Sequence, residues 1–337
     1  MAVMLHHHGH YYDELFPGRT PLSVNLDPGH FGVELFFIIS GFVILMTGER
    51  QRTLKVFAFS RFTRLMPTFV VALVLATTIY TLAPMPPLLP PTPLQFLANL
   101  TMAPSLLLVT PIDLPYWTLT YELVFYGYMA LILYFGLTRS IEWFGLLAVA
   151  IGCLCLLTMN VEQHHRLSIM LLLYYSNFFV IGICLYRVYG RAARPITYVA
   201  LASAILATGL GGGERSFYAS GPLYLSLALG FALLVWFATS KSGRWLAWSP
   251  FLFFGRISYA LYLVHAAIGF EIIRFGIEHS WSTIAGVLAA GLASVAVATI
   301  LHYTIEVPTM QWSRDWLKRR RKPTPNPIRS ANETSHM

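Results

Sequence analysis

The sequence predicts an all-α integral membrane protein built as a polytopic bundle of transmembrane helices. Of its 337 residues, 56% are hydrophobic and only 11% are charged, whereas soluble domains carry about 25% charged residues. The mean hydropathy is +0.60. Apolar stretches of about 20 residues, the length that crosses about 30 Å of hydrocarbon as a helix, recur along the chain. A soluble fold could not bury this much apolar surface, so lipid is expected around most of the protein.

Nine complete spans and a truncated first helix are expected in a membrane domain of residues 1–316. The apolar stretch at residues 1–5 is interpreted as the end of that first helix, because it is too short to cross a membrane alone. The expected spans are residues 31–47, 65–83, 117–136, 141–159, 168–189, 195–210, 221–239, 251–270 and 281–305. Residues 317–337 are basic, then polar and rich in proline, which predicts a disordered tail.

Basic residues predict the topology. They gather on alternate connections, at residues 50–64, 139, 187–194, 241–244 and 318–322. By the positive-inside rule these connections are cytoplasmic, so the C-terminus is cytoplasmic and residues 6–30 face outward from a cell membrane. The net charge is +8, and the basic residues that produce it lie beside the spans and in the tail, not on one face of a soluble domain. Anionic lipid is therefore the expected partner of the basic tail, and no nucleic acid is expected.

The three cysteines predict neither a disulfide nor a metal site. All three lie in apolar stretches, and none belongs to a paired cysteine or Cys/His ligand motif. We therefore expect no bound metal.

Ionisable side chains are costly within apolar helices, so the stretches that retain them are candidates for function. The first stretch contains His6, His7, His8 and His10, followed by His30 and Glu34. A histidine can move a proton near neutral pH, and a carboxylate can fix its tautomer. A solvated histidine cluster that binds adventitious metal is the alternative interpretation.

The second stretch pairs Arg61 with Arg64 at the cytoplasmic mouth of a span. Arginines three residues apart share a helix face, so both guanidinium groups can bind one phosphate-bearing ligand. Anchoring of the helix to lipid head groups is the alternative.

Two further stretches place polar groups in apolar helices. Glu122 lies about one turn into the helix that begins at Trp117, where it needs a partner or water; an interfacial aromatic anchor with a half-hydrated glutamate is the alternative. Later, Ser258, Tyr262 and His265 recur at helical spacing and can line one interior face. A structural hydrogen-bond network between helices would use the same pattern.

Taken in order, these stretches resemble the acyltransferase 3 family of membrane proteins, whose members O-acylate sugars of cell-surface polysaccharides and glycolipids. The resemblance runs over residues 1–316. It rests on a glycine-valine-acid-x-Phe-Phe-x-x-Ser-Gly-Phe stretch at residues 32–42, the Arg-x-x-Arg pair, a Trp-x-Leu-x-x-Glu-x-x-Phe-Tyr stretch at residues 117–126 and Ser-Tyr-x-x-Tyr-Leu-x-His at residues 258–265. Two features depart from the family: Glu34 replaces an aspartate, and the family's early arginine would precede Met1.

The resemblance implies an acyl-CoA-dependent O-acyltransferase that moves an acyl group, with acetyl expected, from cytoplasmic acyl-CoA to a hydroxyl of a glycan or lipid-linked sugar. The implied general base or acyl carrier is His7, or His6 or His8 if the alignment slips by one residue. Glu34 or Glu122 would orient it, and Arg61 and Arg64 would bind the phosphates of CoA. The residues expected to line the substrate tunnel are His30, Ser40, Trp117, Tyr126, Tyr259, Tyr262 and His265.

Two other functions use the same features. A transporter would also place histidine, glutamate and arginine within its helices. An inactive, truncated relative could act as a scaffold among polysaccharide-assembly proteins.

Overall fold

The computed structural model describes residues 1–16, 20, 22, 24–51, 53–159, 161–215 and 220–320. Within these ranges the protein is helical and has no β-strand, as predicted. Six helical stretches are long and apolar enough to cross a membrane: Asp27–Gln51, Leu54–Leu82, Leu137–Thr158, Gly221–Thr239, Ser249–Glu278 and Thr283–Arg319. They contain α3 (Gly32–Gln51), α4 (Leu54–Leu82), α7 (Ile141–Thr158), α11 (Gly221–Thr239), α12 (Ser249–Glu278) and α13 (Thr283–Leu301) with α14 (Val307–Arg320).

The other three predicted spans correspond to shorter or less apolar helices. α6 (Trp117–Tyr134) contains Glu122, and α10 (Pro195–Arg215) has its apolar part at Pro195–Leu210. The expected span at residues 168–189 is not one helix: α8 (His165–Met170) ends early and α9 begins anew at Ser176, running to Tyr189. Leu172 has a φ of 52°, a left-handed conformation that an α-helix cannot contain, so the chain turns between the two helices.

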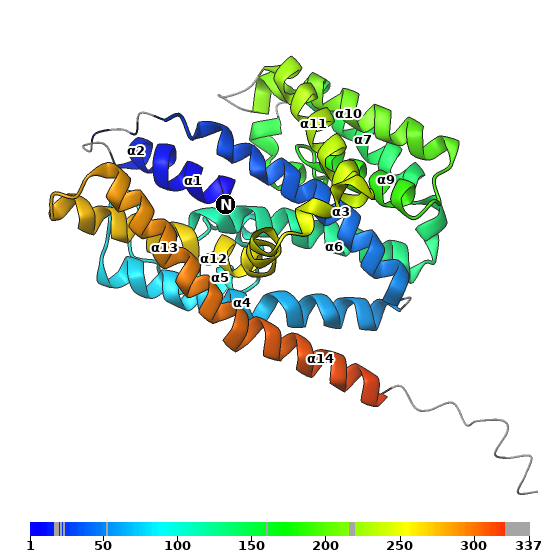
Figure 1. Cartoon of the computed structure of the whole chain (residues 1–337). Coiled ribbons are helices and arrows are strands. Elements are labelled where there is room, and N and C mark those ends of the chain that lie inside the picture. The colour runs from blue at the N-terminus through cyan, green and yellow to red at the C-terminus, as the bar shows by residue number, and fades with distance from the viewer. Residues whose placement is uncertain are drawn as a thin grey trace, which may run out of the picture.

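α3 crosses the middle of the bundle and contacts α9 backbone to backbone (Figure 1). A Cβ at Gly41 would overlap the carbonyl oxygen of Phe179, and one at Gly182 would overlap that of Ile38. The glycines allow the two backbones to approach closely. The resulting van der Waals contact stabilises the helix pair, because lipid provides no hydrophobic driving force between helices. This contact fixes the helix that carries Ser40.

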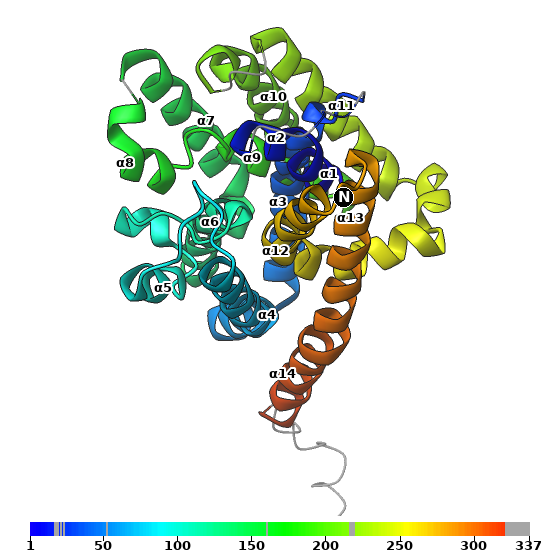
Figure 2. The same cartoon turned by 90° about the vertical axis from the view of Figure 1, so that its left-hand side faces the viewer.

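α12 packs against α13 and α4, and α13 continues through the π-helical turn η8 (His302–Glu306) into α14. Together α13, η8 and α14 form a long rod, and α14 projects beyond the rest of the bundle (Figure 2). The helix ends at Arg320, four residues beyond the predicted domain boundary at Trp316. The remainder of the predicted tail lies outside the described residues.

The connection between α4 and α6 folds back on the bundle. It contains α5 (Pro93–Asn99), η3 (Pro104–Leu107) and η4 (Leu114–Tyr116). The buried Asn99 donates to the carbonyl oxygen of Gln95 and accepts from the amide of Ile112. Asp113 is also buried and accepts a hydrogen bond of 2.8 Å from the Tyr80 hydroxyl. Burial raises the pKa of the Asp113 carboxyl to about 6.

A buried ion-pair network joins α7, α9 and the start of α10. The side chain of Glu142 is 0% exposed and contacts Arg187 Nε at 3.4 Å and Arg194 Nη2 at 2.9 Å. Arg187 also binds Glu49 of α3 at 2.6 Å. In the sequence these arginines are topology signals only, but in the structure they hold four segments together.

The N-terminal segment is a continuous helical stretch made of α1 (Ala2–His6), the π-helical η1 (His7–Tyr11) and α2 (Tyr12–Leu15). It packs against η2 (Asp27–Phe31), the 3-10 turn that leads into α3, and against α12. Figure 1 shows the N-terminal end of the chain beside α12 and α13, where Met1 itself is 52% exposed. His6, His7 and His8 are buried, so three of the four histidines of this segment face the interior of the helical domain.

Candidate functional site

A cavity of about 370 Å³ lies between α1, α3, α4, α6 and α12. Ligand pockets commonly have volumes of about 300 to 1,000 Å³. Eight of the twelve predicted site residues line it: Ser40, Arg61, Arg64, Glu122, Tyr126, Tyr259, Tyr262 and His265. The sequence motifs, which are up to 225 positions apart, thus meet at one place.

The cavity follows one face of α12. Ser258, Tyr259, Tyr262 and His265 line it, and the seven residue steps from Ser258 to His265 correspond to roughly 10 Å at 1.5 Å per residue. The Tyr259 hydroxyl donates to the carbonyl oxygen of Leu65, one residue after Arg64. The arginine pair and His265 therefore occupy opposite ends of the cavity.

Arg61 is buried at the first end. It is 8% exposed, with its guanidinium over the rings of Phe57 and Tyr126 at 5.8 and 6.0 Å from their centroids. Within the described residues neither Arg61 nor Arg64 forms an ion pair, and Arg61 Nε has no hydrogen-bond partner. A buried cation is costly when no anion pairs with it directly. The Glu122 carboxylate is near Arg61 but forms no ion pair with it, so this end is suited to an anionic ligand.

Glu122 does not contact His7, although the sequence analysis considered that it might orient it. Its Oε1 accepts a short hydrogen bond from the Tyr126 hydroxyl and another of 3.4 Å from Ser40 Oγ. Both arginines lie within electrostatic range of this carboxylate. Glu122 is therefore part of the arginine end of the cavity.

His265 forms the other end of the cavity, and His7 lies directly behind it. His7 Nδ1 lies 2.7 Å from His265 Nε2, and the rings are parallel, at an angle of 3° with centroids 5.0 Å apart. His265 Nδ1 faces only carbonyl oxygens, those of Leu261 at 3.1 Å and Tyr262 at 2.9 Å. Because a carbonyl can only accept, neutral His265 carries its proton on Nδ1 and accepts at Nε2. His7 then donates from Nδ1, and its Nε2 retains the lone pair of a base.

The resemblance leaves open which of His6, His7 and His8 is the family's histidine, and the contacts of the three side chains differ. His7 contacts His265, whereas His8 Nε2 donates to the backbone carbonyl of His265 at 2.8 Å. His6 points away to Asp27, with 3.4 Å between Nδ1 and Oδ1. Consecutive residues of a helix point in different directions, and this turn is π-helical, a distortion that is frequent at functional sites.

The four other predicted site residues lie beside the cavity, since none of them is part of its described lining. His7 is behind His265. Glu34 is buried in the first turn of α3, where the helix dipole favours a negative charge. His30 Nδ1 donates to the carbonyl oxygen of Asp27 at 2.7 Å, and Trp117 packs against Tyr121 and Tyr175. The structure gives His265, not Glu34, the contact that orients His7.

Gly269 makes the position of His8 possible. A Cβ at residue 269 would overlap the imidazole of His8. We expect Gly269→Ala to push η1 away from α12 and to lower activity about 10-fold, with a loss of stability of about 1 to 3 kcal/mol from overpacking. Gly255→Ala on the same helix is the matched control, because nothing lies within 4 Å of its added Cβ. Thermal unfolding and activity of both variants in detergent would test this, and equal behaviour would contradict it.

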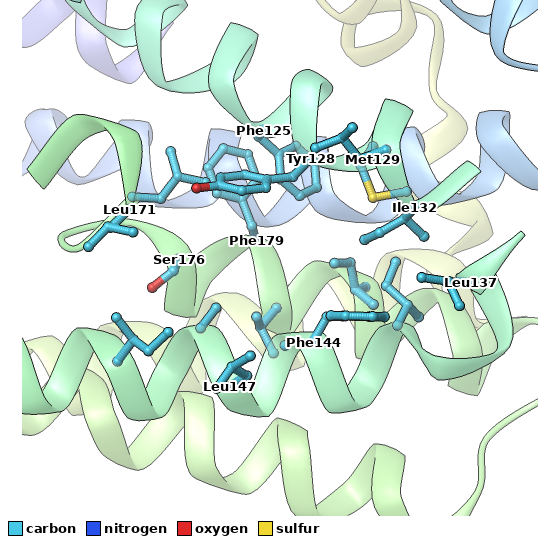
Figure 3. Close-up of a pocket in the computed structure, with 18 of the residues that line it drawn as sticks. Phe125, Tyr128, Met129, Ile132, Leu137, Phe144, Leu147, Leu171, Ser176 and Phe179 are labelled. Atoms are coloured by element: carbon cyan, nitrogen blue, oxygen red, sulfur yellow. The ribbon is translucent and has the colours of Figure 1, made fainter. Parts of the chain in front are cut away.

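A second pocket, of about 340 Å³, lies between α6, α7 and α9. Figure 3 shows Phe125, Tyr128, Phe144 and Phe179 around it. Its described lining is apolar apart from Ser176 and the Tyr128 hydroxyl, which donates to the carbonyl of Met170 at 2.6 Å. Without an acid, base or cation in that lining, this pocket is suited to hydrocarbon and not to catalysis.

Comparison with known proteins agrees with the motifs. No curated protein and no solved structure matches the chain. Residues 1–303 match the family model described as an acyltransferase domain, the acyltransferase 3 domain. The match includes both ends of the cavity and both histidines that meet there. The chain therefore belongs to the acyltransferase 3 family and is a multi-pass membrane acyltransferase.

Proposed function

We propose that this acyltransferase takes an acyl group, acetyl in the first instance, from cytoplasmic acyl-CoA and transfers it to a hydroxyl of a cell-surface or lipid-linked sugar. The observation that carries the proposal is the cavity, which has the buried Arg61 and the half-buried Arg64 at one end and His265, backed by His7, at the other. A CoA thioester has the same polarity, with phosphates at one end and the reactive carbonyl at the other.

The arginine end is the proposed donor site. Arg61 and Arg64 would bind phosphate oxygens of CoA, because guanidinium forks bind phosphate with strong charge-assisted hydrogen bonds. A cavity of about 370 Å³ suits the narrow pantetheine arm and acyl group, so the nucleotide would remain at the mouth. The positive-inside rule makes this mouth cytoplasmic.

The histidine end is the proposed site of chemistry. The acceptor hydroxyl oxygen attacks the thioester carbonyl while its proton passes to His7 Nε2. The tetrahedral intermediate then expels the CoA thiolate, which takes a proton back from His7, so the products are the ester and free CoA. His265 is a positioning residue: it accepts the Nδ1 proton of His7 and stabilises the imidazolium that forms.

The acceptor would approach from the side that carries α1 and η2, because the donor occupies the cavity on the other side of His265. This arrangement lets the reaction bridge the membrane without moving either substrate across it. Glycan or lipid-linked sugar is the acceptor class implied by the family, and proteins of polysaccharide assembly are the partners we propose.

Release of CoA is the direct test. Purified protein in detergent or liposomes should consume acetyl-CoA and release free thiol, faster when a sugar acceptor is present. Mass spectrometry of surface glycans from cells with and without the protein should show an added acetyl mass. A folded protein that neither binds nor consumes any short acyl-CoA would refute the proposal and favour a transporter.

A further inference from the structure

A second cluster of ligand-type side chains lies on the side of His7 remote from the cavity. It contains His6 of α1, His10 of η1 and the pair Asp27 and His30 of η2. His6 Nδ1 and His10 Nε2 lie 3.4 and 3.7 Å from Asp27 Oδ1. One ligand atom from each of His6, Asp27 and His30 lies within 4.8 Å of the other two.

The spacing within each helix brings these side chains together. His6 and His10 are four residues apart, the spacing that places two histidines on one helical face toward a zinc ion. Asp27 and His30 are three residues apart on a 3-10 turn, where side chains at i and i+3 eclipse. The two helices touch at Gly29, where a Cβ would overlap the carbonyl oxygen of Ala2. Two ligand pairs thus face each other across one tight contact.

The distances match a tetrahedral metal site. Zinc binds imidazole nitrogen at about 2.0 to 2.1 Å and carboxylate oxygen at about 2.0 to 2.2 Å, so its ligand atoms lie about 3.3 Å from one another. The separations of 3.4 and 3.7 Å from Asp27 are close to this value. His6, Asp27 and His30 already form the compact group, whereas His10 Nε2 lies 3.3 Å from Glu14 Oε1 and would have to turn toward Asp27 to become the fourth ligand.

The surroundings of His30 also fit a metal ligand. Its Nδ1 donates to the backbone carbonyl of Asp27 at 2.7 Å, so the neutral ring carries its proton on Nδ1. A histidine that binds a metal through one nitrogen usually donates from the other to a carbonyl or carboxylate, which fixes its tautomer. The side chain of His10 is 39% exposed and offers a path for the ion from solvent.

We propose that His6, Asp27 and His30, with His10 as fourth ligand, bind one Zn²⁺ ion that fastens the N-terminal helix to η2. Three imidazoles and a carboxylate form a ligand set that zinc prefers. Because His7 directly follows His6, the ion holds His7 against His265 without taking part in acyl transfer. No resident metal was expected from the sequence, because the cysteines form no ligand motif, the histidine cluster indicated at most an adventitious ion, and Asp27 was not among the candidate residues.

Zinc binding by the whole chain tests the inference independently of activity. The protein is purified in detergent through a tag without histidine, stripped with chelator and titrated with Zn²⁺ in a calorimeter. We expect one equivalent to bind and the apparent melting temperature to rise. Asp27→Asn, which keeps the shape of the side chain, should weaken binding at least about 10-fold, the loss that even a change beyond the direct ligands typically causes. His164→Ala, which removes an exposed histidine elsewhere, should bind as the unmodified chain does.

Two outcomes would overturn the inference. One is the absence of stoichiometric zinc binding by the unmodified protein. The other is equal affinity in the Asp27→Asn variant, which would assign the ion to a different histidine cluster. If the variant does not fold, Co²⁺ added to the stripped unmodified protein decides: an intense visible absorption of tetrahedral cobalt supports the site, and the weak spectrum of an octahedral ion contradicts it.

Discussion

Replacing His7 with alanine is expected to lower the rate of acyl transfer by about 10² to 10⁴, the usual contribution of positioned proton transfer. This corresponds to roughly 3 to 5 kcal/mol of transition-state stabilisation. Binding of acyl-CoA should not change, because His7 is not part of the described cavity lining. The effect should therefore appear in kcat, measured as thiol release with saturating donor and acceptor.

The control for His7→Ala is His164→Ala, since His164 is exposed and lies in η6 (Val161–His164), outside both proposed sites. His265→Gln should also lower kcat, because the amide cannot stabilise an imidazolium as a second imidazole does. A His7→Ala protein that is folded, binds donor and transfers acyl groups at the normal rate would remove His7 from the mechanism.

The double variant Arg61→Ala/Arg64→Ala is expected to weaken acyl-CoA binding by about 10² to 10⁴. Each hydrogen bond to a charged group contributes about 1.5 to 3 kcal/mol, and about 1.4 kcal/mol is a tenfold change in Kd. The buried Glu122 carboxylate lies within electrostatic range of both arginines, so thermal unfolding of the double variant is measured beside its affinity to show that it folds. Equilibrium binding of labelled CoA to the detergent-solubilised protein measures the effect.

The matched control removes two exposed positive charges elsewhere, as Lys241→Ala/Arg244→Ala. It separates specific phosphate recognition from a general loss of positive potential. Arg61→Lys adds a second comparison, because lysine keeps the charge and loses the planar fork, so an intermediate affinity is expected. Donor affinity unchanged in the double alanine variant would contradict the assignment of this end of the cavity.

The helical membrane architecture could be predicted from the sequence because hydrophobicity and length alone decide which segments cross a bilayer. The break between α8 and α9 could not, because it depends on the left-handed conformation at Leu172 and on the packing of Tyr175 against Phe37. Periodicity within residues 168–189 is the same for a straight helix and for a broken one. Tertiary packing decides between them.

The sequence motifs name residues that meet around one cavity, but they do not give the contacts among them. Motif residues identified both ends of the cavity, yet spacing could not show that Arg61 is buried or that His265 is the partner of His7. The His7–His265 contact joins residues 258 positions apart and depends on how the N-terminal helical segment packs on α12. Asp27 was missed because a single aspartate before a proline resembles a turn residue. The signal that could have found it is its spacing to His30.

The buried network around Glu142 has a consequence for how the protein is made. Arg194, one of its partners, lies 52 positions further along the chain, and translation at about 5 to 20 residues per second delivers it roughly 3 to 10 s later. Until Arg187 and then Arg194 have been synthesised, the carboxylate of α7 lacks the cations that offset its desolvation. Helix α7 is therefore expected to wait at the translocon or in the head-group region, and to enter the bilayer together with the two helices that follow.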